Sequence, residues 1–230
     1  MNEKDCLLLN IFIFVMIYFL IYYIMKKKRT RRRTNKVRTQ KRKKKTKNDN
    51  VVYIKNFLNQ NDFNKIKGLN TDKNNFKHEK FRYIRPLDRN IDGDVYNIFY
   101  DNKYIKKIQR HLNPKIFESE FPIEHRIYDK DSEGMKWHKD TLLYKKPQYE
   151  AIFTIDNMSK SETHYKDEND RLHKLWTEPN TLLVVKAQGY SHGVTPTLTG
   201  EREILKLIYT QTNEINDNYI QEMKRFDKLN

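Results

Sequence analysis

The sequence predicts an α+β fold that is mainly β with flanking helices, preceded by one transmembrane helix. Short runs of β-branched and aromatic residues, separated by turn residues, predict the strands. Segments with apolar residues at helical spacing predict the helices that brace them. A run of twenty almost wholly apolar residues near the N-terminus predicts the membrane span.

The apolar run covers residues 6–25, from Cys6 to Met25, and Asn10 is its only strongly polar member. Twenty residues at helical rise cross the hydrocarbon core of a bilayer, which is about 30 Å thick. A cleavable signal peptide would begin with a basic region and end in small residues. Here residues 1–5 include two acidic groups, and Tyr22 and Tyr23 lie near the end of the run. The sequence therefore favours a retained anchor over a signal peptide or a buried core helix.

Residues 26–50 form a strongly basic linker. Fifteen of the 46 Lys and Arg residues lie between Lys26 and Lys47, a stretch without an acidic residue, so we expect it to be extended and disordered. Basic residues that directly follow a span are retained in the cytosol. We therefore expect a single-pass membrane protein with a cytosolic domain. The only cysteine, Cys6, lies in the span, so the domain forms no disulfide, which agrees with this placement.

The basic linker predicts an anionic partner. Next to a membrane span, anionic lipid headgroups are favoured, at about 1 kcal/mol per basic residue close to the surface. Nucleic-acid binding and nuclear import are the competing roles. Beyond residue 47 the chain carries 30 basic and 28 acidic residues, so the domain is nearly neutral and its composition argues against nucleic acid as its partner.

Residues 51–212 have the length of one ordinary domain. A strand at Val51 precedes a short helix that ends near residue 69, with apolar residues at Phe63, Ile66 and Leu69. A second helix is expected over residues 101–112, with Tyr104, Ile105 and Ile108 facing the core.

The second half of this domain predicts strands, turns and one long loop. Strands are expected over residues 135–140, 151–156, 181–186 and 201–210, with turn chemistry at residues 197–200. The polar segment 157–170 predicts a mobile loop near the site mouth. Residues 213–230 form a tail with a final helix expected around Tyr219, Ile220 and Met223.

Four polar residues carry the chemistry that the sequence predicts. His138 and Asp140 lie two positions apart, so both face one side of an extended segment. His192 is expected near the end of one strand and Arg202 near the start of its neighbour. Two imidazoles and one carboxylate are the facial triad of a non-haem Fe(II) site, which leaves open metal positions. An arginine nearby can hold a carboxylate with two parallel hydrogen bonds, and Lys206 on the same strand face is its alternative.

Two segments resemble a known family. IYDKDSEGMKWHKD (residues 127–140) and SHGVTPTLTGER (residues 191–202) resemble the proximal and distal histidine segments of 2-oxoglutarate and Fe(II)-dependent dioxygenases of the prolyl 4-hydroxylase type. The resemblance covers most of residues 51–210 and implies a double-stranded β-helix, or jelly roll. It implies Fe(II), 2-oxoglutarate and O2, with ascorbate as a reductant, and a protein or peptide substrate.

The resemblance also assigns roles to residues. It implies that His138, Asp140 and His192 are the iron ligands and that Arg202 completes the catalytic set by pairing with the distal carboxylate of 2-oxoglutarate. Hydrogen bonds to the same co-substrate are implied for two further residues, Tyr128 and Thr154. The remaining histidines have no partner at ligand spacing and are expected on the surface or behind the ligands: His78, His111, His125, His164 and His173.

The sequence departs from the family in places that bear on the substrate. Collagen-type prolyl hydroxylases usually carry lysine where this chain has Arg202, so both prolyl and lysyl side chains stay open as targets. Two other functions are alternatives to a protein hydroxylase. An oxidative demethylase of nucleic acid would need a basic groove, and a non-catalytic, membrane-tethered jelly-roll interaction protein would not need the triad. The abundance of Lys, Asn, Ile and Tyr is typical of an AT-rich genome, such as that of a large DNA virus.

Overall fold

The computed structural model describes residues 16, 18–28, 49–79 and 81–227 in two compact units, residues 1–46 and 47–230. In the first unit, residues 18–28 are helical. Within the described part of the chain, no helix has the length and apolar character needed to cross a bilayer. Residues 6–15 and 17 of the expected span, and residues 29–48 of the expected linker, lie outside the described residues. The anchor and the linker therefore stay predictions.

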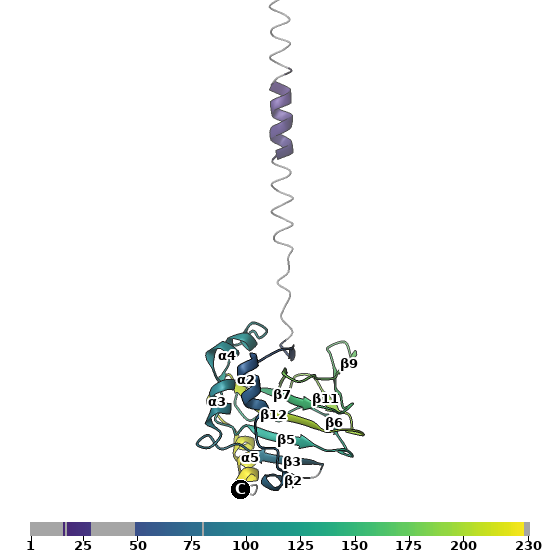
Figure 1. The fold of residues 1–230 in the computed structure, drawn as a ribbon. Helices are drawn as coiled ribbons and strands as arrows, with labels where there is room; N and C mark the ends of the chain where they lie inside the picture. The colour runs from purple at the N-terminus through teal and green to yellow at the C-terminus, as the bar shows by residue number, and fades with distance from the viewer. Residues whose placement is uncertain (1–15, 17, 29–48, 80, 228–230) are drawn as a thin grey trace, which may run out of the picture. The chain divides into compact units, whose positions relative to one another are not determined.

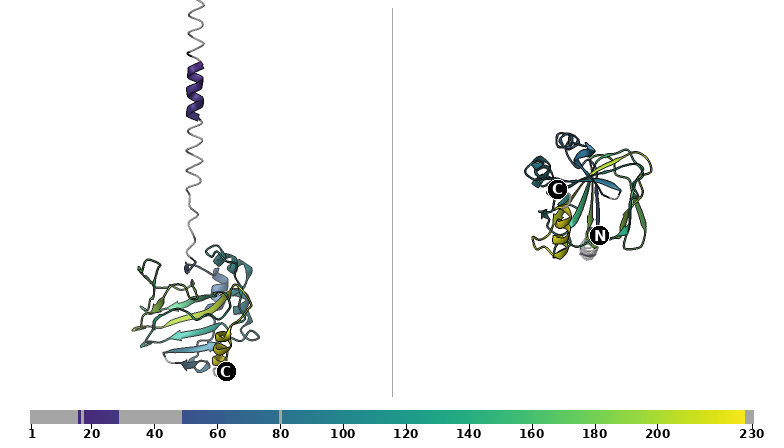
Figure 2. Two further views of the ribbon diagram at one scale, coloured as in Figure 1. Left: turned by 180° about the vertical axis from the view of Figure 1, so that it is seen from behind. Right: turned by 90° about the horizontal axis from the view of Figure 1, so that it is seen from below.

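The second unit is built on two antiparallel sheets, which face each other in Figures 1 and 2. The larger sheet has the order β1 (Val51–Ile54), β10 (Thr181–Lys186), β7 (Tyr149–Asn157), β12 (Arg202–Thr210), β5 (Glu124–Tyr128), β3 (Arg82–Pro86) and β2 (Lys77–Glu79), and β4 (Phe117–Glu118) pairs with β12. The smaller sheet has the order β6 (Met135–His138), β11 (His192–Val194), β8 (Thr163–Lys166) and β9 (Leu172–Leu175).

Helices cover the face of the larger sheet that points away from the smaller one (Figure 1). They are α2 (Gln60–Lys67), α3 (Gly93–Phe99) and α4 (Asn102–Gln109), with a short 3-10 turn at Lys73–Asn75. Their apolar side chains form one core with Phe153, Leu182 and Leu205 from the sheet. The C-terminal helix α5 (Asp217–Asp227) packs through Phe226 in a second, smaller cluster. The helices expected near residues 60–69, 101–112 and 213–230 are confirmed as α2, α4 and α5.

The central strands β5, β7 and β10 of the larger sheet are largely buried on both faces. In β7, Phe153 points to the helices, whereas Glu150 and Ile152 point to a cavity between the two sheets. The same alternation places Leu205 of β12 in the helical core and Lys206 in the cavity wall. The centre of the larger sheet thus has the apolar core on one face and the polar lining of the cavity on the other.

Two expectations about the second half of the domain are wrong. Residues 157–170 contain strand β8, which pairs with β11 and β9, so this segment is not simply a loop. His192 begins a strand of its own in the smaller sheet, whereas Arg202 begins β12 in the larger sheet. The cause is a turn after β10, where Gln188 has a positive φ of 58° and the chain crosses to the other sheet. The strands expected over residues 151–156, 181–186 and 201–210 are present as β7, β10 and β12. Of the strand expected over residues 135–140, β6 covers residues 135–138, so Asp140 lies just beyond its end.

Gly134 allows β6 and β11 to lie side by side. Its φ is +75°, and a Cβ at this position would lie 2.3 Å from the carbonyl oxygen of Val194 and 2.8 Å from the carbonyl carbon of Thr195. Val194 closes β11 and Gly134 directly precedes β6, so any side chain here would push the two strands apart.

We predict that Gly134→Ala lowers the free energy of unfolding by at least about 1 kcal/mol, because the new methyl group meets rigid backbone in a left-handed conformation. Urea denaturation of a fragment spanning residues 47–230 measures the change. Gly93→Ala is the matched control, because Gly93 lies in α3 and a Cβ there meets nothing within 4 Å. Equal losses of stability in the two variants would contradict the close approach at Gly134.

Candidate metal centre

Strand pairing in the smaller sheet brings two histidines together. His138, the last residue of β6, lies directly opposite His192, the first residue of β11. Directly opposed residues of an antiparallel pair point to the same face of the sheet. Their rings are accordingly adjacent, with centroids 4.4 Å apart.

Backbone carbonyls fix which ring nitrogen of each histidine faces the cavity. Nδ1 of His138 lies 2.8 Å from the carbonyl oxygen of Lys136, and Nδ1 of His192 lies 3.2 Å from that of Tyr190. A carbonyl oxygen only accepts, so each Nδ1 donates its proton and each neutral ring keeps its lone pair on Nε2. Both imidazoles are therefore held in the tautomer in which Nε2 can bind a metal.

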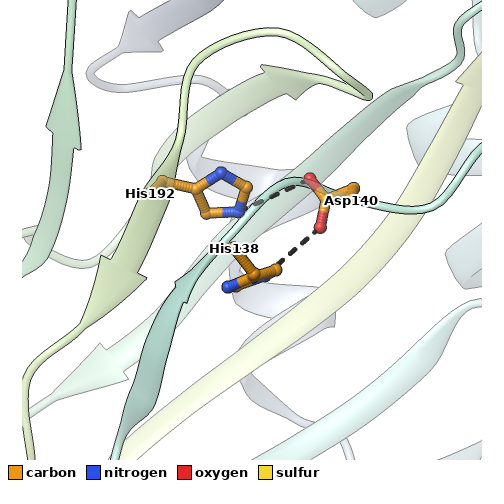
Figure 3. Close-up of side chains that lie close together, drawn as sticks. All are labelled: His138, Asp140 and His192. Atoms are coloured by element: carbon orange, nitrogen blue, oxygen red, sulfur yellow. Dashed lines mark ion pairs between the residues drawn. The ribbon is translucent and has the colours of Figure 1, made fainter.

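Asp140 completes the cluster from the segment just beyond β6. Its Oδ1 lies 3.5 Å from Nε2 of His138, and its Oδ2 lies 3.4 Å from Nε2 of His192 (Figure 3). Burial alone would raise the pKa of Asp140, but the two histidines and Lys206 outweigh it and hold the pKa well below its ordinary value. Asp140 in turn raises the pKa of His138. The carboxylate is thus an anion that both imidazoles face.

The spacing of these three residues suits a metal ion better than direct hydrogen bonds. Both nitrogen–oxygen distances exceed the usual 2.7–3.2 Å of a hydrogen bond, and the buried Oδ2 of Asp140 has no hydrogen-bond partner among the described residues. Two ligands at about 2.1 Å from one metal, at a right angle, lie about 3 Å apart. All three ligand atoms lie within 4.8 Å of one another. Two neutral nitrogens and one carboxylate are the donor set that non-haem Fe(II) takes.

Arg202 lies in the same cavity, which has a volume of about 70 Å³. The residue is only 4% exposed, and its Nη2 donates a hydrogen bond to Oγ1 of Thr177 at 3.3 Å. Its buried Nε has no partner, and among the described residues no carboxylate forms an ion pair with it. Burial lowers the pKa of Arg202, which is the direction expected of a guanidinium that lacks an anion. The structure thus places an uncompensated cation near the three ligands.

Tyr128 lies directly opposite Arg202 in the pairing of β5 with β12 and also lines the cavity. Burial raises the pKa of its phenol, but Arg126, Arg82 and Arg202 outweigh this effect and lower the pKa. The phenol therefore lies in a strongly positive part of the cavity, where a hydroxyl can share an anion with Arg202.

The other charges in the cavity wall are already paired. Lys206 Nζ lies 2.7 Å from a carboxylate oxygen of Glu150, and Arg126 donates to Glu124 from Nε at 3.1 Å and from Nη2 at 2.8 Å. Burial alone would raise the pKa of Glu124, but Arg126, Lys206 and Arg225 lower it to about 2. The alternative anion partner, Lys206, therefore has an anion of its own, whereas Arg202 does not.

Thr154 does not line the cavity. It is buried in β7, where its hydroxyl donates to Oγ1 of Thr177 at 2.8 Å, and the same oxygen accepts from Arg202. Its short side chain thus reaches the arginine only through Thr177. Another expectation is wrong at His125, which is fully buried on the face of the larger sheet away from the cavity, with Nε2 2.7 Å from Glu203.

Several residues at the site were not identified from the sequence. Thr177, Glu150 and Arg126 contact or surround the four predicted residues. In β5 the charged residues Glu124 and Arg126 occupy alternate positions, so the sequence alone predicts that they face solvent. A signal that could have located these two residues is their spacing, because opposite charges two positions apart share one face of a strand and can pair there.

Comparisons with known proteins bear on the fold. No model of a known protein family matches the sequence, and neither does any curated protein. An oxidoreductase of the 2OG-Fe(II) oxygenase family from Burkholderia pseudomallei has a similar structure, with a TM-score of 0.59 and 15% identity over 74% of this chain and 88% of that one.

Two further solved structures are similar. A prolyl hydroxylase from Trichoplax adhaerens, in complex with a hypoxia inducible factor peptide, gives a TM-score of 0.57 and 12% identity over 71% of this chain and 84% of its own. HygX from Streptomyces hygroscopicus, with nickel and 2-oxoglutarate bound, gives a TM-score of 0.53 and 11% identity over 71% of this chain and 83% of its own. At these identities the likeness shows the fold, and the domain has the mainly β, antiparallel fold of these oxygenases.

Proposed function

We propose that the domain is an Fe(II)- and 2-oxoglutarate-dependent dioxygenase that hydroxylates a prolyl or lysyl side chain of a protein. One observation carries the proposal: the cavity that holds His138, Asp140 and His192 also holds the unpaired, buried Arg202. A metal site alone is compatible with many enzymes. A metal site with a buried cation that lacks its anion selects a co-substrate that can bind the metal and carries a second carboxylate.

The residues divide the work of binding and orientation. Nε2 of His138, Nε2 of His192 and one oxygen of Asp140 would hold Fe(II), whose open positions supply the chemistry of dioxygen activation coupled to decarboxylation of 2-oxoglutarate to succinate. Arg202, with Tyr128 beside it, would hold the distal carboxylate. Thr154 would act indirectly, by fixing Thr177 against the guanidinium. The fold also occurs in a prolyl hydroxylase that binds a peptide, which supports a protein substrate.

Both alternatives fit less well. For a nucleic-acid demethylase we would expect a strongly basic groove, whereas two of the cavity's basic residues, Arg126 and Lys206, are neutralised by carboxylates. A non-catalytic interaction protein gains nothing from a buried arginine without an anion, which costs stability.

We also propose that the domain is tethered to a membrane by residues 6–25, with residues 26–47 against anionic lipid and the domain in the cytosol. The support is the sequence: an apolar run of sufficient length followed by fifteen basic residues.

The first prediction concerns the ligands. His138→Ala, Asp140→Ala and His192→Ala should each abolish succinate formation and weaken Mn(II) binding, used as an Fe(II) substitute, by at least tenfold, since two remaining ligands hold a metal poorly. Electron paramagnetic resonance measures free Mn(II). His164→Ala is the control, because His164 pairs with Glu162 away from the cluster. Full turnover by Asp140→Ala would refute the assignment.

The second prediction concerns the anion partner. Arg202→Ala should raise the KM for 2-oxoglutarate at least tenfold, because a hydrogen bond to a charged group contributes ~1.5–3 kcal/mol and tenfold is about 1.4 kcal/mol. Mn(II) binding should persist. Arg202→Lys should retain part of the affinity, since the charge stays and the two-pronged geometry is lost. If Lys206→Ala raised the KM while Arg202→Ala left it unchanged, the partner would be Lys206.

The third prediction concerns topology. Engineered N-glycosylation sites in exposed turns of the domain, such as residues 168–171, should stay unmodified in a eukaryotic cell, because a cytosolic domain never meets the glycosylation machinery. Gel mobility with and without glycosidase measures this, and an acceptor site placed before residue 6 is the reciprocal control. Glycosylation of the domain would overturn its cytosolic placement.

A further inference from the structure

Three aromatic rings stand in parallel on the smaller sheet beside the candidate metal centre. Tyr165 of β8 lies between His173 of β9 and Tyr190, which precedes β11. Its ring centroid is 4.6 Å from that of His173 and 6.0 Å from that of Tyr190, and the interplanar angles are 6° and 2°. We call Tyr190, Tyr165 and His173 the aromatic stack.

Strand register places Tyr165 and His173 of the aromatic stack on the same face as His138 and His192. Tyr165 lies directly opposite His192, which in turn lies opposite His138, and His173 lies opposite Tyr165. Directly opposed residues have Cβ atoms about 4.5–5.5 Å apart and share a face. A single row of four side chains therefore runs across the sheet from the metal centre to the aromatic stack.

Two carboxylates hold the outer rings in place. Nε2 of His173 lies 2.9 Å from Asp167, and the hydroxyl of Tyr190 donates to Glu168. Both carboxylates belong to the turn between β8 and β9. The backbone carbonyl of Tyr190 also accepts a hydrogen bond from Nδ1 of His192. Tyr190 therefore contacts both the ring of Tyr165 and a candidate metal ligand.

Tyr165 has a hydroxyl without a partner. Its side chain is partly exposed, and among the described residues its phenol makes no hydrogen bond, although its ring is stacked with those of His173 and Tyr190. The neighbouring residue Lys166 points to the other face, where its ammonium lies over the ring of Trp137. A ring fixed on both sides and a free hydroxyl next to a metal ligand are what a positioning residue requires.

We infer that Tyr165 positions the substrate, and that the substrate there is an extended peptide whose main-chain carbonyl accepts a hydrogen bond from the Tyr165 hydroxyl. The inference rests on the proposed function and specifies how its substrate is bound. An extended peptide presents carbonyls at a rise of about 3.3 Å per residue, so one can meet the hydroxyl while a neighbouring side chain reaches the metal. A phosphate backbone on the same path would approach Asp167 and Glu168, which disfavours nucleic acid.

The test uses the full-length chain with Fe(II), 2-oxoglutarate, O2 and two pools of random eleven-residue peptides, one with a central proline and one with a central lysine. Mass spectrometry detects a gain of one oxygen, and succinate is measured in the same reactions. Tyr165→Phe keeps the stacked ring and removes the hydroxyl. We expect this variant to raise the KM for the peptide substrate at least fivefold. It should also form more succinate per hydroxylated peptide, while the KM for 2-oxoglutarate stays unchanged.

A matched pair of histidines separates the aromatic stack from the rest of the sheet. His173→Ala should raise the peptide KM, because it removes one side of the support of Tyr165. His164→Ala should not, because His164 lies on the opposite face, where it pairs with Glu162 in the same way at 2.9 Å. A general loss of folding would affect both variants.

The outcomes separate this inference from the proposed function. If the wild-type chain hydroxylates a peptide and Tyr165→Phe and His173→Ala leave its KM and coupling unchanged, the positioning role is wrong. If the wild type forms succinate but modifies neither pool, the peptide is wrong while the dioxygenase proposal stands. Without any succinate from the wild type, the proposed function fails and this inference with it.

Discussion

The cross-strand pair of His138 and His192 is the constraint on which the site depends. These two residues come from segments 54 positions apart in sequence, and only the register of β6 against β11 makes them neighbours. Gly134 lets the two strands approach, and Asp140 follows β6 closely enough to face both rings. A shift of one residue in this pairing would turn one imidazole to the outside of the sheet.

Charge balance in the cavity makes the site specific. The buried Arg126 and the partly buried Lys206 have carboxylate partners within 3 Å, so their burial is compensated inside the protein. Arg202 is as buried as Arg126 and has no such partner among the described residues. This difference between a paired and an unpaired cation, more than the number of cations, supports Arg202 as the proposed partner of an anionic co-substrate.

The two faces of the larger sheet have separate tasks. The face toward α2, α3 and α4 carries the packed apolar core, in which Phe57, Phe99 and Phe153 pack against one another. The other face carries the charged cavity wall. Because the apolar core on the opposite face stabilises the fold, the residues of the cavity wall can be polar. The smaller sheet also has two distinct faces, with the candidate metal ligands and the aromatic stack on its inner face and Trp137, Lys166 and His164 on its outer face.

The sequence by itself determined the elements whose signal is local. The apolar run Thr181–Lys186, the helical spacing of Phe63 and Ile66, and the tail helix were all read correctly, because each depends on periodicity within a few residues. The four residues His138, Asp140, His192 and Arg202 could be selected for the same reason: their types and spacing are visible without a fold.

Only the tertiary structure decided how these pieces face one another. It put His192 and Arg202 in different sheets, made a strand of residues 163–166, and buried Glu124, Arg126 and Glu150, whose alternation with apolar residues reads as a solvent face in sequence. Burial of a charge depends on the group that neutralises it. Glu124 and Arg126 pair within β5, but the partner of Glu150 in β7 is Lys206, which lies on another strand, β12. Such pairing has no signature in either strand alone, so the cavity that defines the site could not be read from the sequence.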